Sequence, residues 1–229
     1  MTATMQDLAT PATGDGRRRL VVIGNGMAGA RTVEEILERG GAMQFSITMF
    51  GDEPYGNYNR IMLSHVLSGE EQDSDIFLNS LPWYEENQIQ LHAGCRVNRV
   101  DRFAKLVYSD DGQVTPYDVL VIATGSRSFI PTMAGMNTAE GEPLPGIFAF
   151  RTIDDTRNMV SHARDHQRAV IIGGGLLGLE AARGLQSHGM QVDVVHAGPH
   201  LMNAQMGAAG GDILQRSVER LGITVHTNA

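Results

Sequence analysis

The stretch that decides the fold is Leu20-Val21-Val22-Ile23-Gly24-Asn25-Gly26-Met27-Ala28-Gly29-Ala30, which joins an apolar run to a Gly-x-Gly-x-x-Gly motif. The apolar run has the length and bounds of a buried parallel strand, which we expect over residues 19–23. Apolar side chains then recur on one helical face over residues 28–39, and Gly40-Gly41 can end that helix. With a second strand over residues 45–50, the order strand–helix–strand predicts an α/β unit.

The three glycines of this motif have separate tasks in a dinucleotide site. A pyrophosphate must approach the backbone at a helix N-terminus, where N–H groups and the helix dipole favour negative charge. Gly24 allows the tight turn, Gly26 removes a side chain that would block the phosphate, and Gly29 lets helix and strand pack closely. An acid about 20 residues further on is expected to bind a ribose hydroxyl. Asp52 and Glu53 stand in the right place for it.

The same order of elements returns later in the chain. An apolar run over residues 169–172 leads into Gly173-Gly174-Gly175-Leu176-Leu177-Gly178. A helix is expected over residues 179–187 and another strand over residues 191–196. The sequence therefore predicts two Rossmann-like dinucleotide-binding domains, both incomplete in this chain.

The second motif lacks the acid that would select NADH. His196-Ala197-Gly198 follows the strand, and no arginine stands there to take a 2′-phosphate. Asp193 lies inside the strand and is expected to face the wrong way. This site is thus predicted to bind a pyrophosphate while the choice between NADH and NADPH stays open. Two such units in one chain favour FAD paired with a nicotinamide cofactor, because hydride passes directly between them.

Composition excludes several other functions. The 229 residues carry a formal charge of −8, with a pI near 5.4. That balance disfavours binding to nucleic acid or to an anionic membrane. The single cysteine, Cys95, excludes an intrachain disulfide and a four-cysteine zinc or iron–sulfur site, and an ordinary buried thiol is expected. Arg17-Arg18-Arg19 resembles a twin-arginine signal, but the apolar stretch after it is too short, so a solvated charge run and a cytoplasmic protein are expected.

The chain divides into three predicted parts: a flexible tail over residues 1–18, the first part of an FAD-binding domain over 19–148, and an inserted NAD(P)-binding domain over 149–229. Between the two motifs, apolar patterning predicts further elements. These are a helix over residues 57–68, a short helix over 83–87 anchored by Trp83 and Tyr84, a strand over 89–92, a hairpin of 102–107 with 113–117, a strand over 119–123 and a linker over 131–146. A late helix over residues 212–221 and a strand from residue 223 complete the expected order.

Several longer stretches resemble one family. Tyr117 to Ser126 contains the Ala-Thr-Gly motif of two-dinucleotide flavoprotein reductases. Phe50 to Ser64, which includes Asn57-Tyr58-Asn59-Arg60-Ile61, resembles the N-terminal region of the NAD(P)H-dependent assimilatory nitrite reductase large subunit. Ferredoxin reductases carry Pro-Tyr-x-Arg-Pro there. Residues 24–31, 150–155 and 195–202 fit the same family, so the resemblance covers residues 19–229.

The resemblance and the two motifs together imply binding residues for each cofactor. For FAD they are Gly24, Gly26, Met27, Ala28, Gly29, Asp52, Glu53, Asn59, Arg60, Ser64, Val97, Ala123, Thr124 and Gly125. For NAD(P) they are Gly173, Gly175, Leu176, Leu177, Gly178, Glu180 and His196. Glu180 would lie near the junction of flavin and nicotinamide. No acid–base side chain and no metal ligand are expected, and His162 and His166 are read as solvated helix residues.

The resemblance implies an FAD-dependent, NAD(P)H-oxidising electron-entry module of a nitrite-reductase-type enzyme. Electrons would pass to sirohaem and 4Fe-4S centres outside this chain, in an acceptor domain or a small subunit, and a homodimer is one option. The family has acids in the stretch Leu201 to Gly207 that this chain lacks. The chain is expected to be an N-terminal fragment or a truncated product. Two alternatives remain open: a stand-alone ferredoxin or rubredoxin reductase, and a nucleotide-binding module without turnover.

Overall fold

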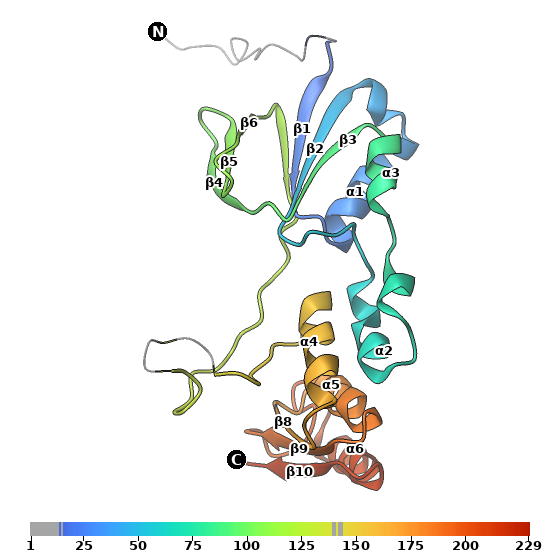
Figure 1. Ribbon diagram of the computed structural model, residues 1–229, viewed down its shortest axis with the longest axis vertical. Helices are drawn as coiled ribbons and strands as arrows, with labels where there is room; N and C mark the ends of the chain where they lie inside the picture. Colours follow the sequence, from blue (N-terminus) through green and yellow to red (C-terminus); the bar gives the residue numbers. More distant parts are fainter. Residues whose placement is uncertain (1–13, 15, 139–140, 142–143) are drawn as a thin grey trace. The chain divides into compact units, whose positions relative to one another are not determined.

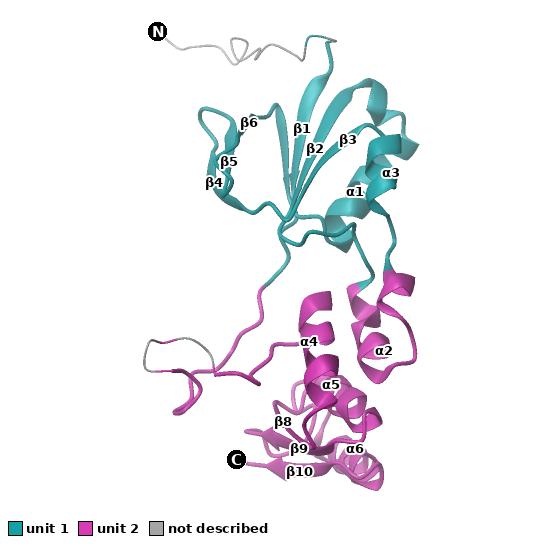
Figure 2. Cartoon of the chain, in the orientation of Figure 1, with its two compact units in different colours: residues 1–59, 77–126 teal, residues 60–76, 127–229 magenta. Residues whose placement is uncertain are grey.

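The computed structural model describes residues 14, 16–138, 141 and 144–229. Most of the predicted flexible tail, residues 1–13 and 15, lies outside the described residues. The chain forms two compact units (Figure 2). The first contains the residues up to 59 together with 77–126, and the second contains 60–76 together with 127–229.

A four-stranded parallel sheet in the order β3-β2-β1-β7 forms the centre of the first unit (Figure 1). Strand β1 is buried on both sides, as its unbroken apolar sequence predicts. The strands are β1 (Arg18–Ile23), β2 (Phe45–Gly51), β3 (Ile89–Ala93) and β7 (Val119–Ile122). All four were predicted, and the α/β class is confirmed.

Each face of this sheet has its own cover. Helices α1 (Met27–Glu38) and α3 (Leu81–Glu86) pack on the face that Leu20 and Val22 share. On the opposite face, Val21 packs against a three-stranded antiparallel sheet. That sheet consists of β4 (Val97–Asp101), β5 (Leu106–Ser109) and β6 (Val114–Pro116). The predicted hairpin is therefore confirmed in β5 and β6, while β4 was not expected.

The predicted strand over residues 102–107 begins too early. Asp101 accepts hydrogen bonds from the backbone N–H groups of Phe103 (3.0 Å) and Ala104 (2.9 Å), and this forms a turn. Lys105 then has a positive φ of 52°. Residues 102–105 thus connect two strands, and the chain is extended again only from Leu106.

The predicted helix over residues 57–68 is wrong at its start. Tyr58 forms an isolated antiparallel bridge with Phe77, so the backbone there is extended. A 3-10 turn over Arg60–Met62 and helix α2 (Leu63–Ser68) follow, and both belong to the second unit. The helical spacing of apolar residues was present, but the long-range bridge overrides it before residue 60.

The charge run Arg17-Arg18-Arg19 is not simply solvated, and its last two residues lie in β1. Arg19 lies in β1 and forms a two-pronged ion pair with Asp118, with an Nη2–Oδ1 distance of 2.8 Å and an Nε–Oδ2 distance of 3.1 Å. This hydrogen-bonded guanidinium lowers the pKa of the Asp118 carboxyl to about 2. The pair joins the start of β1 to the residue before β7, because Asp118 N–H also donates to the Arg19 carbonyl (2.9 Å).

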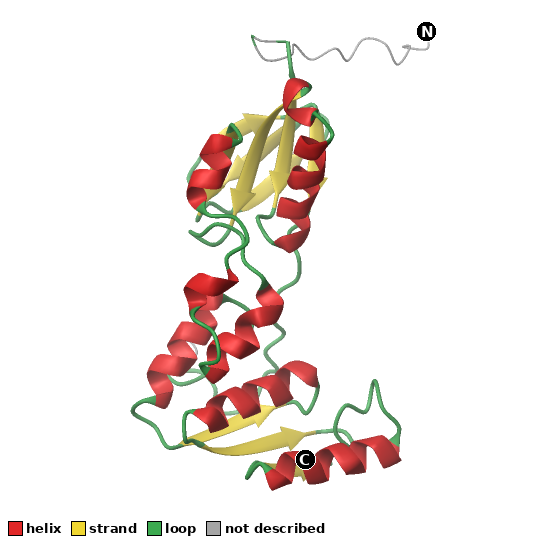
Figure 3. Cartoon of the chain, turned by 90° about the vertical axis from the view of Figure 1, so that its right-hand side faces the viewer, coloured by secondary structure: helices red, strands yellow, loops and turns green. Residues whose placement is uncertain are grey.

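The second unit contains a three-stranded parallel sheet in the order β10-β9-β8. Its strands are β8 (Arg168–Ile172), β9 (Gln191–His196) and β10 (Thr224–Thr227), and its longer helices are α4 (Ile153–Ala163), α5 (Leu176–Ser187) and α6 (Ala208–Arg220) (Figure 3). The helices pack on the face that carries Val192 and Val194. Val170 and Ile172 on β8 are 61% and 53% exposed.

Two helices of this unit begin earlier than predicted, and one was missed. Helix α5 starts at Leu176 and α6 at Ala208, because each begins directly after a glycine whose extended backbone serves as N-cap. Helix α4 starts with a capping box between Thr152 and Asp155. The predicted linker over residues 131–146 holds no helix or strand among its described residues. No helix in the described part of the chain is long and apolar enough to span a bilayer.

Candidate dinucleotide sites

The two glycine turns have the same backbone geometry. Gly24 and Gly173 have φ values of 112° and 114°, which side-chain-bearing residues rarely adopt. Gly24 N–H donates to the carbonyl of Phe50, and Gly173 N–H donates to that of Val195, both at 2.8 Å. The first glycine of each turn therefore has the same φ and is tied to the end of the next strand by the same hydrogen bond.

The third glycine of each motif is required by close packing. A Cβ on Gly29 would overlap the carbonyl oxygen of Gly24, and a Cβ on Gly178 would overlap that of Gly173. The helix can begin against its own strand only because these side chains are missing. The predicted packing role of Gly29 is confirmed, and Gly178 repeats it in the second unit.

Packing within the protein does not require the second glycine of each motif. Gly26 and Gly175 have extended backbones, with φ of −81° and −86°, and no atom within 4 Å of an added Cβ. The first hydrogen bonds within the helices run from Ala30 to Gly26 and from Leu179 to Gly175, both at 3.0 Å. The amide groups before them have no side-chain cap, so uncapped N–H groups face open space. This cradle fits a diphosphate.

The acids after β2 are arranged differently from one another. Glu53 accepts a hydrogen bond from the hydroxyl of Tyr58 at 2.6 Å. Asp52 is exposed, and its carboxylate makes no hydrogen bond within the described residues. Of the two candidates, Asp52 is the carboxylate left available for a ligand.

Strand β7 brings a further predicted segment to the first turn. Ala123 N–H donates to the carbonyl of Ile23 at 2.7 Å, and a Cβ on Gly24 would overlap the Ala123 carbonyl oxygen. Thr124 and Gly125 follow directly and are exposed. Ala123 and Thr124 therefore lie beside the first turn, and the contact of residues 123–125 with FAD stays a prediction.

The remaining residues predicted for FAD lie in different places. Val97 begins β4, two residues after Cys95, whose N–H donates to Gly51 at 2.8 Å. Arg60 and Ser64 belong to the second unit. There Arg60 Nη1 donates to the Arg151 carbonyl at 2.7 Å. Asn59 closes the first part of unit one, and the roles of all these residues at FAD stay predictions.

At the second turn, His196 is held on both sides of its ring. The backbone N–H of Gly174 donates to Nδ1 at 3.2 Å, so Nδ1 carries no proton. Nε2 then carries the proton and donates to Oδ1 of Asn203 at 3.2 Å. Met202 N–H donates to the Gly174 carbonyl at 2.9 Å. His196 is thus part of the turn, and these contacts fix the orientation of its ring.

Helix α5 carries the other residues predicted for the nicotinamide cofactor. Leu176 and Leu177 form its first turn and are 57% and 53% exposed. Glu180 is half-buried one turn further on. Asp193, which was expected to face the wrong way, accepts a hydrogen bond from Nε2 of His226 on β10 at 2.8 Å.

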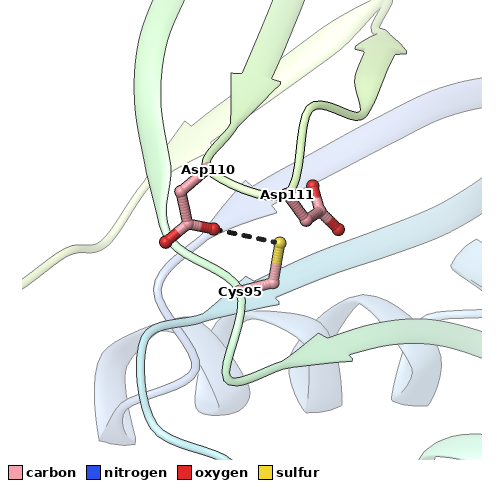
Figure 4. Close-up of side chains that lie close together, drawn as sticks. All are labelled: Cys95, Asp110 and Asp111. Carbon is pink, nitrogen blue, oxygen red and sulfur yellow. Dashed lines mark hydrogen bonds between the residues drawn. The ribbon is translucent and has the colours of Figure 1, made fainter.

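The structure also shows the surroundings of Cys95 and of the pair His162 and His166, for which no metal was expected from the sequence. Within the described part of the chain, one group of side chains that could hold a metal lies close together: Cys95, Asp110 and Asp111 (Figure 4). Burial raises the pKa of the Cys95 thiol, which disfavours the thiolate that a metal needs. The reading of His162 and His166 as solvated helix residues is wrong: His162 lies on α4 and is half-buried, and His166 is exposed but follows the end of the helix at Ala163. Their rings stack with centroids 3.6 Å apart.

A chain with two such turns, each at the start of a helix in its own parallel sheet, is built to bind two dinucleotides. This is the class that the fold and the sites define. The match to known families agrees: the family model described as pyridine nucleotide-disulphide oxidoreductase matches residues 18–229. The chain belongs to this family, which uses FAD and NAD(P)H.

Individual relatives are more specific. The chain is 47% identical to the nitrite reductase [NAD(P)H] of Bacillus subtilis (strain 168), over 91% of this chain and 25% of that protein. It is 42% identical to the assimilatory nitrate reductase electron transfer subunit of the same organism, over 91% of this chain and 26% of that protein. The NADH:rubredoxin oxidoreductase of Clostridium acetobutylicum superposes with a TM-score of 0.81 at 27% identity, over 93% of this chain and 53% of that one.

The chain thus spans about a quarter of the length of these two curated relatives. The predicted resemblance to nitrite reductase large subunits is confirmed by these matches. The predicted fold of two Rossmann-like units is confirmed by the superposition.

Proposed function

We propose that this chain is an FAD-dependent, NAD(P)H-oxidising electron-entry module. The first turn holds the diphosphate of FAD and the second turn holds that of the nicotinamide cofactor. One observation carries the proposal: Gly26 and Gly175 are required neither by backbone strain nor by packing, and both leave open space in front of uncapped helix amides. A ligand diphosphate accounts for both.

In the first unit, this chain's residues bind and orient the flavin nucleotide. The amides of Met27, Ala28 and Gly29 donate to the diphosphate, and Asp52 accepts from a ribose hydroxyl. The residues proposed to line the rest of the cofactor are Glu53, Asn59, Arg60, Ser64, Val97, Ala123, Thr124 and Gly125. Bound FAD supplies the isoalloxazine that takes hydride from the nicotinamide.

In the second unit, the amides after Gly175 bind the nicotinamide cofactor's diphosphate, and Leu176, Leu177 and Glu180 lie where α5 leaves the turn. The end of β9 has no charged side chain that could distinguish a ribose hydroxyl from a 2′-phosphate. The loop from His196 to Gly207 contains no Asp, Glu, Lys or Arg. The loop therefore offers neither a carboxylate that would repel a 2′-phosphate nor an arginine that would pair with it. We therefore propose that the module accepts both NADH and NADPH.

The names of the relatives support the rest of the proposal. A nitrite reductase and a nitrate reductase electron transfer subunit are the most similar of the three relatives compared. We infer that electrons pass from this module to sirohaem and 4Fe-4S centres in an acceptor domain or small subunit, in the cytoplasm, with a homodimer as the assembly to test. The rival, a rubredoxin or ferredoxin reductase, is supported by the superposed structure, whose identity is lower.

Three matched glycine variants test the proposal on the full chain. Gly26→Val should abolish FAD binding and spare NAD(P)H binding, and Gly175→Val should do the reverse. Gly207→Val is the control, because Gly207 is also an N-cap with extended backbone and open space but follows no such turn. Flavin and nicotinamide fluorescence titrations measure both affinities. Wild-type affinities in Gly26→Val and Gly175→Val would contradict the proposal.

A further inference from the structure

A single buried hydroxyl bonds to two separate segments beside the first turn. Tyr84 lies on α3 and is 1% exposed. Its hydroxyl donates to Oδ1 of Asn25 at 2.7 Å and accepts from the backbone N–H of Asn57 at 3.2 Å. The sequence predicted only that Trp83 and Tyr84 anchor the helix on the core, which they do. The hydroxyl adds a polar link that the packing does not need.

The first of these segments is the turn itself. Asn25 stands between Gly24 and Gly26, and its amide Nδ2 donates to the Tyr55 carbonyl at 3.2 Å. Both ends of this side chain are therefore held, one by Tyr84 and one by the chain after β2. In the proposed FAD site the diphosphate meets the backbone on either side of Asn25, so holding that side chain fixes the amides that the ligand needs.

The second segment is the run through Asn57, which is 2% exposed. Its carbonyl accepts from the N–H groups of Leu78 (2.9 Å) and Asn79 (3.4 Å). Its Oδ1 also lies 3.2 Å from the Tyr84 hydroxyl. Asn57 stands two residues before Asn59, a residue proposed for the flavin, so one hydroxyl connects the diphosphate turn with the segment that leads to it.

We propose that Tyr84 is a positioning residue for FAD, which holds the diphosphate turn and the segment around Asn57 in one arrangement. The inference rests on the proposed FAD site. The second turn has no equivalent, because Gly174 has no side chain and is held through its backbone by His196. A change at Tyr84 therefore affects the flavin and leaves the nicotinamide cofactor alone. Burial raises the pKa of the Tyr84 phenol, so it stays a donor at neutral pH.

The experiment is Tyr84→Phe in the full chain, compared with Tyr117→Phe. Tyr117 is also buried in the first unit, at 7% exposure, but its hydroxyl makes no hydrogen bond within the described residues. We expect Tyr84→Phe to weaken FAD binding about five- to tenfold, the equivalent of one hydrogen bond. Tyr117→Phe should leave FAD affinity within about twofold of wild type, and both should keep NAD(P)H affinity. Equal FAD affinities in the two variants would overturn the proposal.

A double-mutant cycle separates positioning from general stability. In an Asn25→Ala background, Tyr84→Phe should weaken FAD binding further by less than about twofold, because its partner is already gone. Fully multiplicative effects would overturn the proposal, since they would show that Tyr84 acts without Asn25. The visible circular dichroism of bound flavin should change in Tyr84→Phe and not in Tyr117→Phe. A wild-type chain that binds no FAD would refute the proposed function itself, and that arm is measured first.

Discussion

The two glycine turns have the same backbone conformation, but the large and the small residue that face each other are in reversed positions. Phe50 and Val195 accept the same hydrogen bond, so Gly51 corresponds to His196 at the strand end. In the first turn the residue after the first glycine is Asn25, and a Cβ on Gly51 would lie 2.9 Å from the Asn25 Cβ.

In the second turn the sizes are reversed: Gly174 faces His196, and a Cβ on Gly174 would lie 3.1 Å from the His196 Cγ. Each site has room for one large residue at this point. The backbone of the proposed diphosphate site is thus the same in both turns. The two sites differ in whether the large residue follows the first glycine, as Asn25 does, or ends the next strand, as His196 does. The first has an amide held by Tyr84, and the second has an imidazole beside the position proposed for the ribose.

The first glycine of each turn gives the largest expected difference between the two units. Gly24→Ala and Gly173→Ala both force a side chain into a strained conformation, at about 1–3 kcal/mol. Only at Gly24 does the new Cβ also overlap the Ala123 carbonyl, while at Gly173 it stands in open space. We expect Gly24→Ala to destabilise its unit by about 3–5 kcal/mol and Gly173→Ala by about 1–3 kcal/mol. Urea unfolding measures both, and equal losses would show that the carbonyl of Ala123 moves aside.

Exchanging the side chains tests the reciprocity directly. Gly174→Asn should destabilise the second unit by about 1–3 kcal/mol, because a Cβ there lies 2.5 Å from Cδ2 of Leu201 as well as close to His196. Adding His196→Gly should recover part of that loss, since it recreates the pair found in the first turn. The free energy of unfolding of both single variants and the double variant gives the coupling. Additive losses would contradict the idea that the two residues share one space.

Acid should destabilise the first unit through the ion pair of Arg19 and Asp118, which both lie in that unit. Arg19 lowers the pKa of Asp118 from 3.8 to about 2, so the folded state binds this proton less readily than the unfolded chain. The pair therefore stabilises above about pH 4, and its contribution of about 1–2 kcal/mol is lost as the pH falls towards 2. Unfolding of wild type and Asp118→Asn between pH 5 and 2 should converge at the acid end. A constant difference across that range would contradict the assignment.

The smallest expected effect concerns the choice of donor. His196→Glu keeps an acceptor for the Gly174 N–H and adds a charge that accepts from a ribose hydroxyl and repels a 2′-phosphate. We expect the ratio of NADH to NADPH affinity to rise about tenfold, or about 1.4 kcal/mol. Titration with each nucleotide measures the ratio. Asn203→Asp is the comparison variant, because it adds a carboxylate beside the ring of His196. An unchanged ratio would place the ribose elsewhere.

The parts of this molecule that the sequence predicted are those with local causes. Strand, glycine turn and helix follow one another within a few residues, so both turns and the roles of Gly24 and Gly29 could be predicted. The Tyr84–Asn25 hydrogen bond joins residues 59 positions apart, and nothing near Tyr84 marks it. The extended backbone at Tyr58 likewise depends on Phe77. Helical spacing around it could not reveal a bridge to a distant residue.

The choice between Asp52 and Glu53 was also beyond the sequence. The two carboxylates are adjacent, and only the structure shows that Tyr58 occupies the second. In the same way, the place of His196 at the end of the strand after the second motif predicted a nucleotide contact. Its fixed tautomer came from the backbone of Gly174 and the side chain of Asn203.

The central claim is that each turn binds one diphosphate, and calorimetric titration of the full chain tests it most directly. We predict one FAD per chain, followed by one NAD(P)H per chain on the flavin-loaded protein. Gly26→Val should remove only the heat of FAD binding, and Gly175→Val only the heat of NAD(P)H binding. Folded protein that takes up neither nucleotide, or binds both through the same turn, would contradict the account.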